Sequence, residues 1–351
     1  MKNILLTGGA GFVGSHTCLA LMEKGYNVFV IDSFVNSSPK ALERVLEIYR
    51  RKKHMNKVDL KIFDIDLCSK DCIKKVFLEF KKLNKNVDGV IHFAGLKAVS
   101  ESVSNPLLYW RINILGTINL LEVMQEFDCR NLVFSSSATI YKQNENSLIK
   151  EVSDLGPINP YGNTKLTIEL ILKDLFVSSE NYWNFASLRY FNPIGAHETG
   201  LLGESPKGIP NNIFPLITNT AFSTNQELSI YGNDWPTEDG TPVRDYIHVM
   251  DLAESHLKIL EYLLRNRSTN LSINVGTGRG TSVLTLIKIF EKINNVKIKY
   301  KFAERRKGDK AFVVADNSLL ISKFDLEPKR TIEDMCRDGW KWKNLNPYGF
   351  C

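Results

Sequence analysis

A tyrosine and a lysine lie four residues apart in the segment NPYGNTK, residues 159–165. Pro160 suits the first position of a helix, and a helix from there places Tyr161 and Lys165 one turn apart on the same face. An ammonium group lowers the pKa of a nearby phenol, because its positive charge favours the phenolate. The pair therefore predicts a tyrosine that acts as general base. An exposed helix start with two unrelated polar residues is the alternative.

A serine cluster stands upstream of this pair. Ser135, Ser136 and Ser137 end a predicted strand, and Ser137 lies 24 residues before Tyr161. A hydroxyl at this place can orient a substrate hydroxyl while the tyrosine takes its proton, and Lys165 can also hold a ribose. Ser137, Tyr161 and Lys165 are therefore the candidate catalytic residues.

A glycine-rich segment, TGGAGFVGSH, follows the first predicted strand and contains Gly8, Gly11 and Gly14. Glycines let the backbone approach a pyrophosphate, and the N-terminus of the next helix supplies free N–H groups. Asp32 ends the second strand, where a carboxylate accepts hydrogen bonds from ribose hydroxyls and repels a 2′-phosphate. The pattern predicts an NAD site; a tight turn without a ligand is the alternative.

Two later strand ends fit the same cofactor. Asp66 and Leu67 follow the third strand, where Asp66 can accept a hydrogen bond from the adenine amino group. Phe93, Ala94 and Gly95 follow the fourth strand and include small residues where a cofactor must pass close to the chain. An Asp at a strand end is also a common cap, so each signal is weak alone.

Alternating strands and helices must position these residues. Apolar runs predict strands at 3–8, 27–32, 60–66, 88–95, 131–138 and 184–192. Helical patterns lie between them, at 13–24, about 39–50, 69–83, about 105–126 and 161–177. This alternation predicts an α/β fold with a Rossmann-type doubly wound parallel sheet, in which ligands bind at the carboxyl ends of the strands.

The alternation weakens after residue 192, where segments rich in Gly, Pro and Asn dominate. A helix at 250–264 and a strand at 271–276 are regular enough to return to the sheet. We therefore expect an NAD-binding domain over residues 1–190, to which 245–276 returns. Residues 191–351 are expected to form mainly a smaller, C-terminal substrate-binding lobe.

Composition sets broad limits on function. The 351 residues are 43% hydrophobic and 24% charged, which is typical of a globular protein. A net charge of +6 without a recognition motif argues against nucleic-acid binding. Six cysteines without paired spacing indicate a reducing compartment, and a strand that starts by residue 3 leaves no room for a targeting peptide, so we expect a cytoplasmic protein. No apolar stretch reaches 18 residues, and the six histidines lack ligand spacing, so neither a membrane span nor a metal is expected.

The motifs together resemble the extended short-chain dehydrogenases/reductases, and within them the UDP-glucose 4-epimerases (UDP-galactose 4-epimerases). The resemblance runs nearly from end to end. The segments that carry it are TGGAGFVGSHT, IHFAGLKAVSESV, FSSSATIY, NPYGNTK, LRYFNPIGAH, GIPNN, IYGNDWPTEDGTPVRDYIHVMDLA, NVGTGRGTSV and RRKGD. The segments HFAGLKAV and PTEDGTPVRDYIHV separate this family from its relatives.

The resemblance implies two sets of contacts. The implied NAD contacts, beside the glycines, are Phe12, Val13, Asp32, Ser33, Phe34, Val35, Asn36, Ser37, Asp66, Leu67, Phe93, Ala94, Gly95, Leu96, Lys97, Asn113, Ser137, Tyr161, Lys165 and Phe191. The implied UDP-sugar contacts are Ser137, Tyr161, Asn192, Asn212, Ile213, Ser229, Ile230, Tyr231, Arg244, Arg306, Lys307, Gly308, Asp309 and Val313.

Chemistry agrees with the second set. Arg244 and Arg306 carry forked donors that suit a pyrophosphate, and Tyr231 can stack on uracil. Asn192 and Asn212 offer paired donors and acceptors. Each arginine is, from the sequence alone, equally well explained as a surface ion pair.

The resemblance implies interconversion of UDP-galactose and UDP-glucose, through oxidation of C4 to a 4-ketose, rotation of the sugar and reduction on the opposite face. A related 4,6-dehydratase needs an Asp-Glu pair after the hydroxyl residue, where this chain has Ala138 and Thr139. Another sugar-nucleotide enzyme of the same family, such as a dehydrogenase that releases NADH, stays open. A non-catalytic NAD-sensing module is disfavoured because Tyr161 and Lys165 are both present.

Two positions depart from the family pattern. Lys142 replaces the usual glycine and precedes a different loop, 142–150. Val313 aligns with the gate of the sugar pocket and has intermediate volume, so acceptance of UDP-N-acetylhexosamines stays open.

The predicted helices 105–126 and 161–177 carry broad apolar faces. Burial in the core explains these faces, and the homodimer that the resemblance implies is the alternative.

Overall fold

The computed structural model describes residues 1–52, 57–142, 147–179, 182–208, 210, 212–223, 226–306 and 308–350. The chain divides into two compact units. The first unit comprises residues 1–140, 155–189 and 253–273, and the second comprises 141–154, 190–252 and 274–351.

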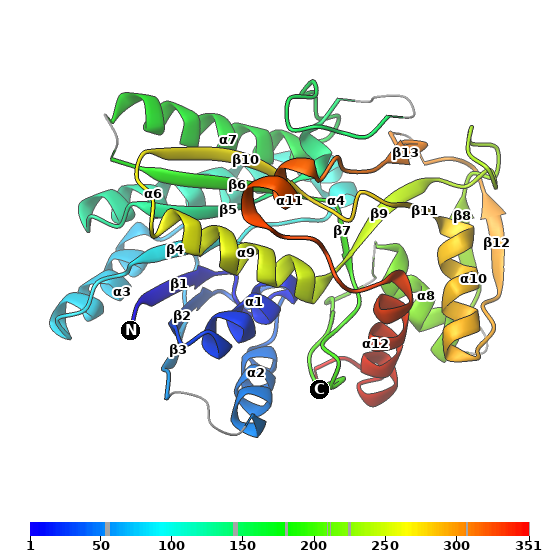
Figure 1. The fold of residues 1–351 in the computed structure, drawn as a ribbon, viewed down its shortest axis with the longest axis horizontal. Coiled ribbons are helices and arrows are strands. Elements are labelled where there is room, and N and C mark those ends of the chain that lie inside the picture. Colours follow the sequence, from blue (N-terminus) through cyan, green and yellow to red (C-terminus); the bar gives the residue numbers. More distant parts are fainter. Residues whose placement is uncertain are drawn as a thin grey trace. The chain divides into compact units, whose positions relative to one another are not determined.

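A seven-stranded sheet forms the centre of the first unit (Figure 1). Its strand order is β10-β6-β5-β4-β1-β2-β3. The strands are β1 (Asn3–Thr7), β2 (Asn27–Asp32), β3 (Leu60–Asp64), β4 (Gly89–His92), β5 (Asn131–Ser137), β6 (Asn184–Tyr190) and β10 (Thr269–Val275). The pairs β1–β2, β1–β4, β2–β3 and β4–β5 are parallel. The chain order reverses between β1 and β4, and doubly wound sheets bind ligands at such a point.

Helices cover both faces of this sheet (Figure 1). One face carries α3 (Lys70–Lys82), α6 (Gly116–Glu126) and α7 (Pro160–Ser178). Their buried side chains share one core with β1, β2, β4, β5 and β6, which includes Phe77, Leu120, Phe134 and Leu172. The other face carries α1 (Phe12–Glu23), α2 (Pro39–Arg51) and α9 (Val249–Leu263).

The segment expected as one helix over 105–126 consists of several pieces. Within it, α5 (Pro106–Tyr109) leads into a π-helical segment, η1 (Trp110–Leu115), before α6. A further short helix, α4 (Val99–Ser104), precedes this segment. The wider π turn accommodates an additional residue, and the periodicity of a short apolar face does not reveal it. Such π segments are frequent at functional sites.

The second unit contains two small sheets. One has the order β11-β9-β13, with β7 also paired to β9, and the other pairs β12 with β8. The strands are β7 (Asn192–Ile194), β8 (Leu228–Tyr231), β9 (Val243–His248), β11 (Gly280–Ser282), β12 (Tyr300–Ala303) and β13 (Phe312–Val313). The helices are α8 (Ile213–Phe222), α10 (Val283–Asn294), α11 (Ser318–Phe324) and α12 (Ile332–Leu345). A second core gathers Phe214, Leu286, Phe290 and Met335.

Apart from the segment 105–126 and α4, predicted and observed elements agree to within a few residues in the first unit. The expected strand 271–276 is β10, which does join the large sheet beside β6. Two segments differ from the expected domain boundaries. Residues 245–252 belong to the second unit because β9 pairs there with β7, β11 and β13. Residues 141–154 also belong to it, since Ile149 pairs with Ala315 and its N–H donates to the carbonyl of Val314 at 2.9 Å.

The described residues lack two features. No helix there combines the length and the apolar character needed to cross a membrane. No group of three or more His, Cys, Asp or Glu side chains there is arranged to hold a metal ion.

Candidate functional site

The start of α7 fixes the tyrosine–lysine pair. Asn159 caps the helix by accepting the N–H of Gly162 at 2.8 Å, and Pro160 occupies the first turn. Tyr161 and Lys165 are 9% and 4% exposed, so both side chains are nearly removed from solvent.

A backbone carbonyl and two aromatic rings surround the ammonium group of Lys165. Its Nζ donates to the carbonyl of Ser135 at 2.8 Å and lies 5.8 Å from the centroid of the Tyr161 ring. The ring of Phe134 is 4.9 Å away on β5. Burial lowers the pKa of Lys165 to about 8, because desolvation disfavours the ammonium. The carbonyl and the two ring faces favour the charged form.

Ser137 ends β5 and is 8% exposed. A short 3-10 helix, η2 (Ala138–Ile140), follows it directly. The N–H and the hydroxyl of Thr139 both donate to Ser137 Oγ, at 3.2 and 3.0 Å. Because its oxygen accepts both of these bonds, the Ser137 hydroxyl keeps its own proton to donate to a substrate oxygen. The same arrangement gives Thr139 a structural task and no acid or base role.

The glycine loop after β1 has the form of a dinucleotide cradle. Gly8 has a φ of +69°, and a Cβ there would stand 2.6 Å from the N of Ala94. A Cβ on Gly14 would stand 2.3 Å from the carbonyl oxygen of Gly8. Helix α1 has Gly11 as its N-cap, with no side-chain cap and no acidic residue in its first turn. Its N-terminal N–H groups are therefore available to an anionic ligand, so the loop fits a pyrophosphate.

Asp32 links this loop to the segment after β2. Its Oδ2 accepts the N–H of Ala10 at 2.9 Å, and its Oδ1 accepts the N–H of Phe34 at 3.0 Å and the hydroxyl of Ser37 at 2.8 Å. Phe34 has a φ of +52°, a conformation held by this bond. A carboxylate has about four acceptor positions, so Asp32 retains capacity for a ribose hydroxyl.

Asn113, inside the π segment, holds the chain after β4. Its Oδ1 accepts the N–H of Leu96 at 2.8 Å, and its Nδ2 donates to the Leu96 carbonyl at 3.1 Å and to Thr164 Oγ1 at 3.0 Å. A Cβ on Gly95 would approach Asn113 Oδ1 to 3.0 Å, and its φ of +149° also requires glycine. Thr164 donates in turn to the carbonyl of Tyr161 at 2.8 Å. The Asn113 amide therefore links the segment 93–97 to α7, which carries the candidate catalytic residues.

His92, at the end of β4, is a neutral core residue. Its Nδ1 is 2.6 Å from Thr7 Oγ1, and its Nε2 is 2.8 Å from Thr117 Oγ1. Thr117 donates its own proton to the carbonyl of Asn113 at 2.6 Å, so His92 must donate from Nε2 and accept at Nδ1. Burial, followed by the charge of Lys165, lowers the pKa of His92 to about 3.

The second unit brings together the residues expected to contact the nucleotide. Strand β13 pairs with β9 so that Val313 lies opposite Arg244. Arg244 forms an ion pair with Asp309 and donates to the carbonyl of Val243 at 2.8 Å. The Asp309 carboxylate also accepts the N–H of Lys310 at 3.0 Å. The same carboxylate therefore binds both the Arg244 guanidinium and the backbone of its own loop.

Arg306 and Tyr231 form a second contact in this unit. The guanidinium carbon lies 3.8 Å from the centroid of the tyrosine ring, so one face of the ring is covered. Tyr231 ends β8, whose pairing with β12 also places Ser229 and Ile230. A base can stack only on the remaining face of Tyr231, or on the guanidinium plane itself.

Several other residues expected to contact the substrate or NAD lie on other segments of the second unit. Asn192 begins β7 opposite Tyr246, and the exposed Asn212 is the N-cap of α8, directly before Ile213. The expected NAD contact Phe191 belongs to the second unit, where its N–H donates to the Val275 carbonyl at 3.2 Å. Gly308 has a φ of +81° in the loop before Asp309. Lys307 lies outside the described residues.

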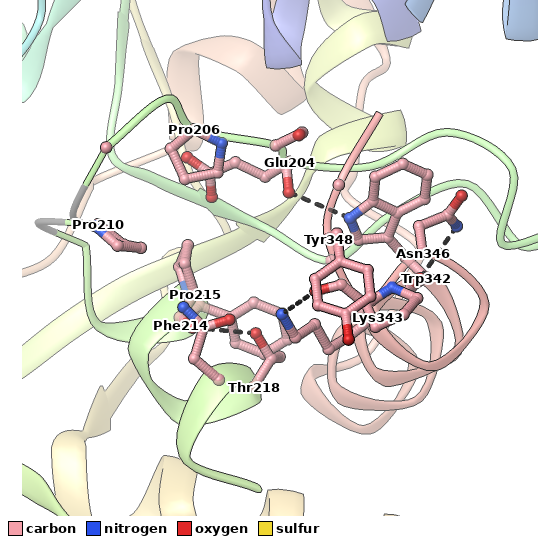
Figure 2. A pocket seen from close by; sticks show the side chains of 17 residues that line it. Glu204, Pro206, Pro210, Phe214, Pro215, Thr218, Trp342, Lys343, Asn346 and Tyr348 are labelled. Carbon is pink, nitrogen blue, oxygen red and sulfur yellow. Dashed lines mark hydrogen bonds between the residues drawn. The ribbon is translucent and has the colours of Figure 1, made fainter. Parts of the chain in front are cut away.

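Two pockets, one in each unit, are lined by none of these residues. Figure 2 shows a pocket of about 180 Å³ in the second unit, between α8, α12 and the C-terminal segment. Its lining includes Phe214, Trp342, Lys343 and Tyr348, with Lys343 donating to the Pro347 carbonyl at 2.7 Å. A polar pocket of about 460 Å³ in the first unit lies where β4, β5 and β6 begin, and therefore at the opposite edge from the glycine loop.

Sequence reasoning missed several supporting residues. The Ser135 carbonyl and the Phe134 ring around Lys165, and Thr164 beside Asn113, follow from the packing of α7 on β5. A backbone carbonyl leaves no signal in a sequence, and the aromatic ring in an apolar strand is indistinguishable from core. Glu169 is the exception: it lies one helical turn after Lys165, on the same face.

The sequence profile of the GDP-mannose 4,6 dehydratase family matches residues 5–339. Among individual proteins, the chain is 47% identical to the UDP-glucose 4-epimerase of Bacillus subtilis over 347 residues, which cover 99% of this chain and 98% of that protein.

Solved structures agree with this match. A UDP-glucose 4-epimerase from Stenotrophomonas maltophila, with bound NAD and formylated UDP-arabinopyranose, superposes with a TM-score of 0.92 at 39% identity and covers 99% of each chain. One from Bifidobacterium longum, in complex with NAD⁺ and UDP, superposes with a TM-score of 0.91 at 42% identity, over 99% of this chain and 100% of that one. The predicted Rossmann-type fold is thereby confirmed.

The profile covers a broad family of sugar-nucleotide enzymes. Two observations identify the branch of that family to which the chain belongs. Ala138 and Thr139 stand where a dehydratase needs an acid pair, and the near full-length relatives are epimerases. The chain therefore belongs to the UDP-glucose 4-epimerase family of the extended short-chain dehydrogenases/reductases.

Proposed function

We propose that this protein interconverts UDP-galactose and UDP-glucose by inverting C4 of the hexose with NAD as cofactor. The observation that carries the proposal is the buried lysine on α7, whose Nζ contacts the Ser135 carbonyl and lies beside the Tyr161 ring. This is the environment that general-base catalysis by a tyrosine requires. The relatives that match nearly the whole chain carry the corresponding activity in their names.

NAD, when bound, takes a hydride from the sugar carbon and returns it to the opposite face. The first unit offers it the glycine cradle, the N-terminus of α1 and the carboxylate of Asp32. The segment 93–97, tied by Asn113, supplies further contacts along the cofactor, with Asp66 and Leu67 near the adenine. The Ser33–Asn36 segment surrounds the ribose that Asp32 holds.

The catalytic residues divide the work on the sugar hydroxyl. Tyr161 removes the proton of the 4-OH and later returns it. The ammonium of Lys165 favours the phenolate and holds the nicotinamide ribose. Ser137 orients the 4-OH by donating a hydrogen bond, since its oxygen already accepts two from Thr139.

The second unit anchors the nucleotide part of the substrate. Arg244 leaves Asp309 in part to bind the diphosphate, and Arg306 supplies a second guanidinium near Tyr231. Asn192, Asn212, Ile213 and the Ser229–Tyr231 strand contact uridine and sugar, with Lys307, Gly308 and Val313 alongside. Strong anchoring of remote groups leaves the hexose free to turn while its carbon stays in reach.

A test of the function needs only the purified protein and a coupled assay for UDP-glucose. UDP-galactose is expected to be converted without added NAD, or with catalytic traces of it, because each turnover regenerates the cofactor. Consumption of one NAD per sugar would contradict epimerisation and indicate a dehydrogenase. No conversion with NAD present would contradict both.

We propose that UDP-N-acetylhexosamines are also accepted, with Val313 as the gate. Valine is smaller than an aromatic residue, and the pairing of Val313 with Arg244, a proposed nucleotide contact, supports this role. Val313→Tyr is expected to reduce turnover of the N-acetylated substrates while turnover of UDP-galactose persists. An unchanged preference would remove Val313 as the gate.

We propose a homodimer formed through α5, the π segment and α7, which pack against one another in the first unit. Apolar side chains on these elements are exposed, such as Leu107 at 80% and Val177 at 73%. An exposed apolar patch of this kind is typical of an interface. Sedimentation is expected to give twice the 39.9 kDa chain mass, and Leu107→Glu to lower it; a monomeric wild type would contradict the proposal.

We also propose a cytoplasmic location. Cys18, Cys129 and Cys336 are buried free thiols with raised pKa values, so the fold has no use for disulfides at these positions. Cell fractionation is expected to find the protein with cytoplasmic markers. Recovery from a secreted or organelle fraction would contradict this.

A further inference from the structure

Glu169, one helical turn after Lys165 on α7, forms a buried ion pair with Arg189. The carboxylate of Glu169, on α7, receives Arg189 Nε at 3.0 and 3.2 Å and Arg189 Nη2 at 2.6 Å. The hydroxyl of Ser136, on β5, donates to the same carboxylate at 2.5 Å. The side chains of Arg189 and Glu169 are 6% and 8% exposed, and Ser136 is fully buried.

The cluster connects two elements at consecutive points. Tyr161, Lys165 and Glu169 are spaced four residues apart, so they follow one face of α7. Lys165 binds the carbonyl of Ser135, and one turn later Glu169 binds the hydroxyl of Ser136. Two neighbouring residues of β5 are thus joined to two successive turns of α7. Ser137, the next residue of the strand, is the proposed substrate contact.

Stability alone does not explain a buried ion pair. Removing two charges from water costs several kcal/mol, and an apolar pair of similar volume is often as stable or more stable. A bidentate arginine–carboxylate pair instead fixes geometry, because the fork admits one arrangement. With the hydroxyl of Ser136 as third member, the arrangement sets both the height and the rotation of α7 against the end of β5.

We propose that Ser136, Glu169 and Arg189 form a positioning cluster that holds the Tyr161–Lys165 helix in register with Ser137. The inference rests on the proposed epimerase function. None of the three residues is among the expected contacts of substrate or cofactor; they act through the placement of the residues that are. Loss of the cluster should slow the chemical step, since misplacement of catalytic groups by about 1 Å costs up to about 100-fold in rate. Nucleotide affinity should persist, because its proposed anchors belong to the second unit.

Ser136→Ala is the most conservative test, because it removes one oxygen atom and leaves the ion pair in place. It is expected to lower kcat by about 5- to 20-fold with the KM for UDP-galactose within about twofold of wild type and bound NAD retained. Ser178→Ala is the matched control, since it changes an exposed serine on the same helix, whose hydroxyl bonds only within α7. This control should retain the wild-type kcat.

A double-mutant cycle tests whether Ser136 acts through Glu169. Glu169→Gln also lowers kcat, and the Ser136→Ala/Glu169→Gln variant should lose less than the product of the two single effects, because both remove the same link. Thermal unfolding of each variant separates loss of fold from loss of rate, and if Glu169→Gln does not fold, Ser136→Ala decides alone. A wild-type kcat in folded Ser136→Ala, or an effect on KM only, overturns the inference. An inactive wild-type protein would instead overturn the proposed function.

Discussion

Lys165 is the residue on which the candidate site depends most. Its ammonium is nearly excluded from water and forms no ion pair with a carboxylate among the residues that the structure describes, so burial lowers its pKa to about 8. The Ser135 carbonyl and two aromatic faces compensate in part for the lost hydration. A cation held in this way exerts its charge on the neighbouring phenol with little screening by solvent.

Removing the phenol oxygen tests the proposed base directly. Tyr161→Phe is expected to lower kcat by about 10²- to 10⁴-fold, which is the usual contribution of general acid–base catalysis. Bound NAD should persist, since the cradle and Asp32 remain. Steady-state assay and the NAD content of the purified variant provide the measurement. A variant that keeps the wild-type rate would show that another group takes the proton.

His92 gives a pH dependence of stability with a definite sign. Because its pKa is lowered to about 3 in the folded protein, the unfolded chain binds one more proton between about pH 6.5 and pH 3. Acidification through this range therefore destabilises the fold. The slope from this single group is about 1.4 kcal/mol per pH unit.

His92→Gln removes this titration. The variant is expected to be less stable than wild type at pH 7.5, because the hydrogen bonds of His92 with Thr7 and Thr117 are lost. Its free energy of unfolding should, however, fall less steeply than that of wild type between pH 6 and pH 4.5. Urea unfolding at several pH values measures both slopes. Parallel slopes would mean that His92 is protonated in the folded protein.

At the scale of elements, the π segment between α5 and α6 fixes the position of the proposed cofactor contacts that follow β4. It turns Asn113 inward, where this side chain is 2% exposed and bonds both polar atoms of Leu96. The Thr164 bond extends the same tie to α7. The segment after β4 and the helix α7 are thus linked by the side-chain amide of Asn113.

Asn113→Ala is expected to release the segment 93–97 and to lower the NAD content of the purified protein to less than about half. The physical reason is the loss of three hydrogen bonds at a buried site, each worth about 1 kcal/mol or more. Absorbance and an enzymatic NAD assay after denaturation give the content.

Asn184→Ala is the matched control for this variant. Asn184 is a buried asparagine at the opposite edge of the sheet, where it bonds Asn131 and the carbonyl of Asn266. It should lower the melting temperature without a loss of NAD. Equal NAD loss in both variants would mean that Asn113 acts only through global stability.

At the scale of the whole molecule, the two units separate the proposed tasks. The glycine cradle and the residues Ser137, Tyr161 and Lys165 belong to the first unit, and Arg244, Arg306 and Val313 belong to the second. Cofactor retention and nucleotide affinity should therefore respond to different substitutions.

Arg244→Ala tests this separation. It should weaken binding of UDP by about 10- to 100-fold, the value of a charge-assisted bidentate contact, with NAD content unchanged. Titration calorimetry with UDP measures the affinity. Arg337→Ala is the control, because it removes an exposed arginine of the same unit that pairs with Asp334 on the surface. Simultaneous loss of NAD in Arg244→Ala would contradict separate tasks.

Much of the fold could be predicted from the sequence, because the patterns that indicate helices, strands and the glycine loop involve residues close together in the chain. The βα alternation, the glycine loop and the helix start at Asn159–Pro160 each depend on neighbouring residues. Apart from the segment 105–126, the elements predicted for the first unit lie within a few residues of the observed ones. The division of the chain into two units was harder to predict from the sequence. Segment 141–154 belongs to the second unit through Asn274, whose Nδ2 binds the Ile149 carbonyl at 2.7 Å, a partner 125 residues away in the chain.

The sequence by itself determined which chemical groups this protein carries and in what order: a glycine cradle, an acidic strand end, and a serine, tyrosine and lysine at fixed spacing. Helix and strand periods translate such spacing into a common face or edge. Only the tertiary structure decided what surrounds these groups. The carbonyl that receives Lys165, the inward turn of Asn113 and the Glu169–Arg189 pair arise where β5, β6, η1 and α7 meet. Contacts between distant segments depend on packing, which local patterns do not encode.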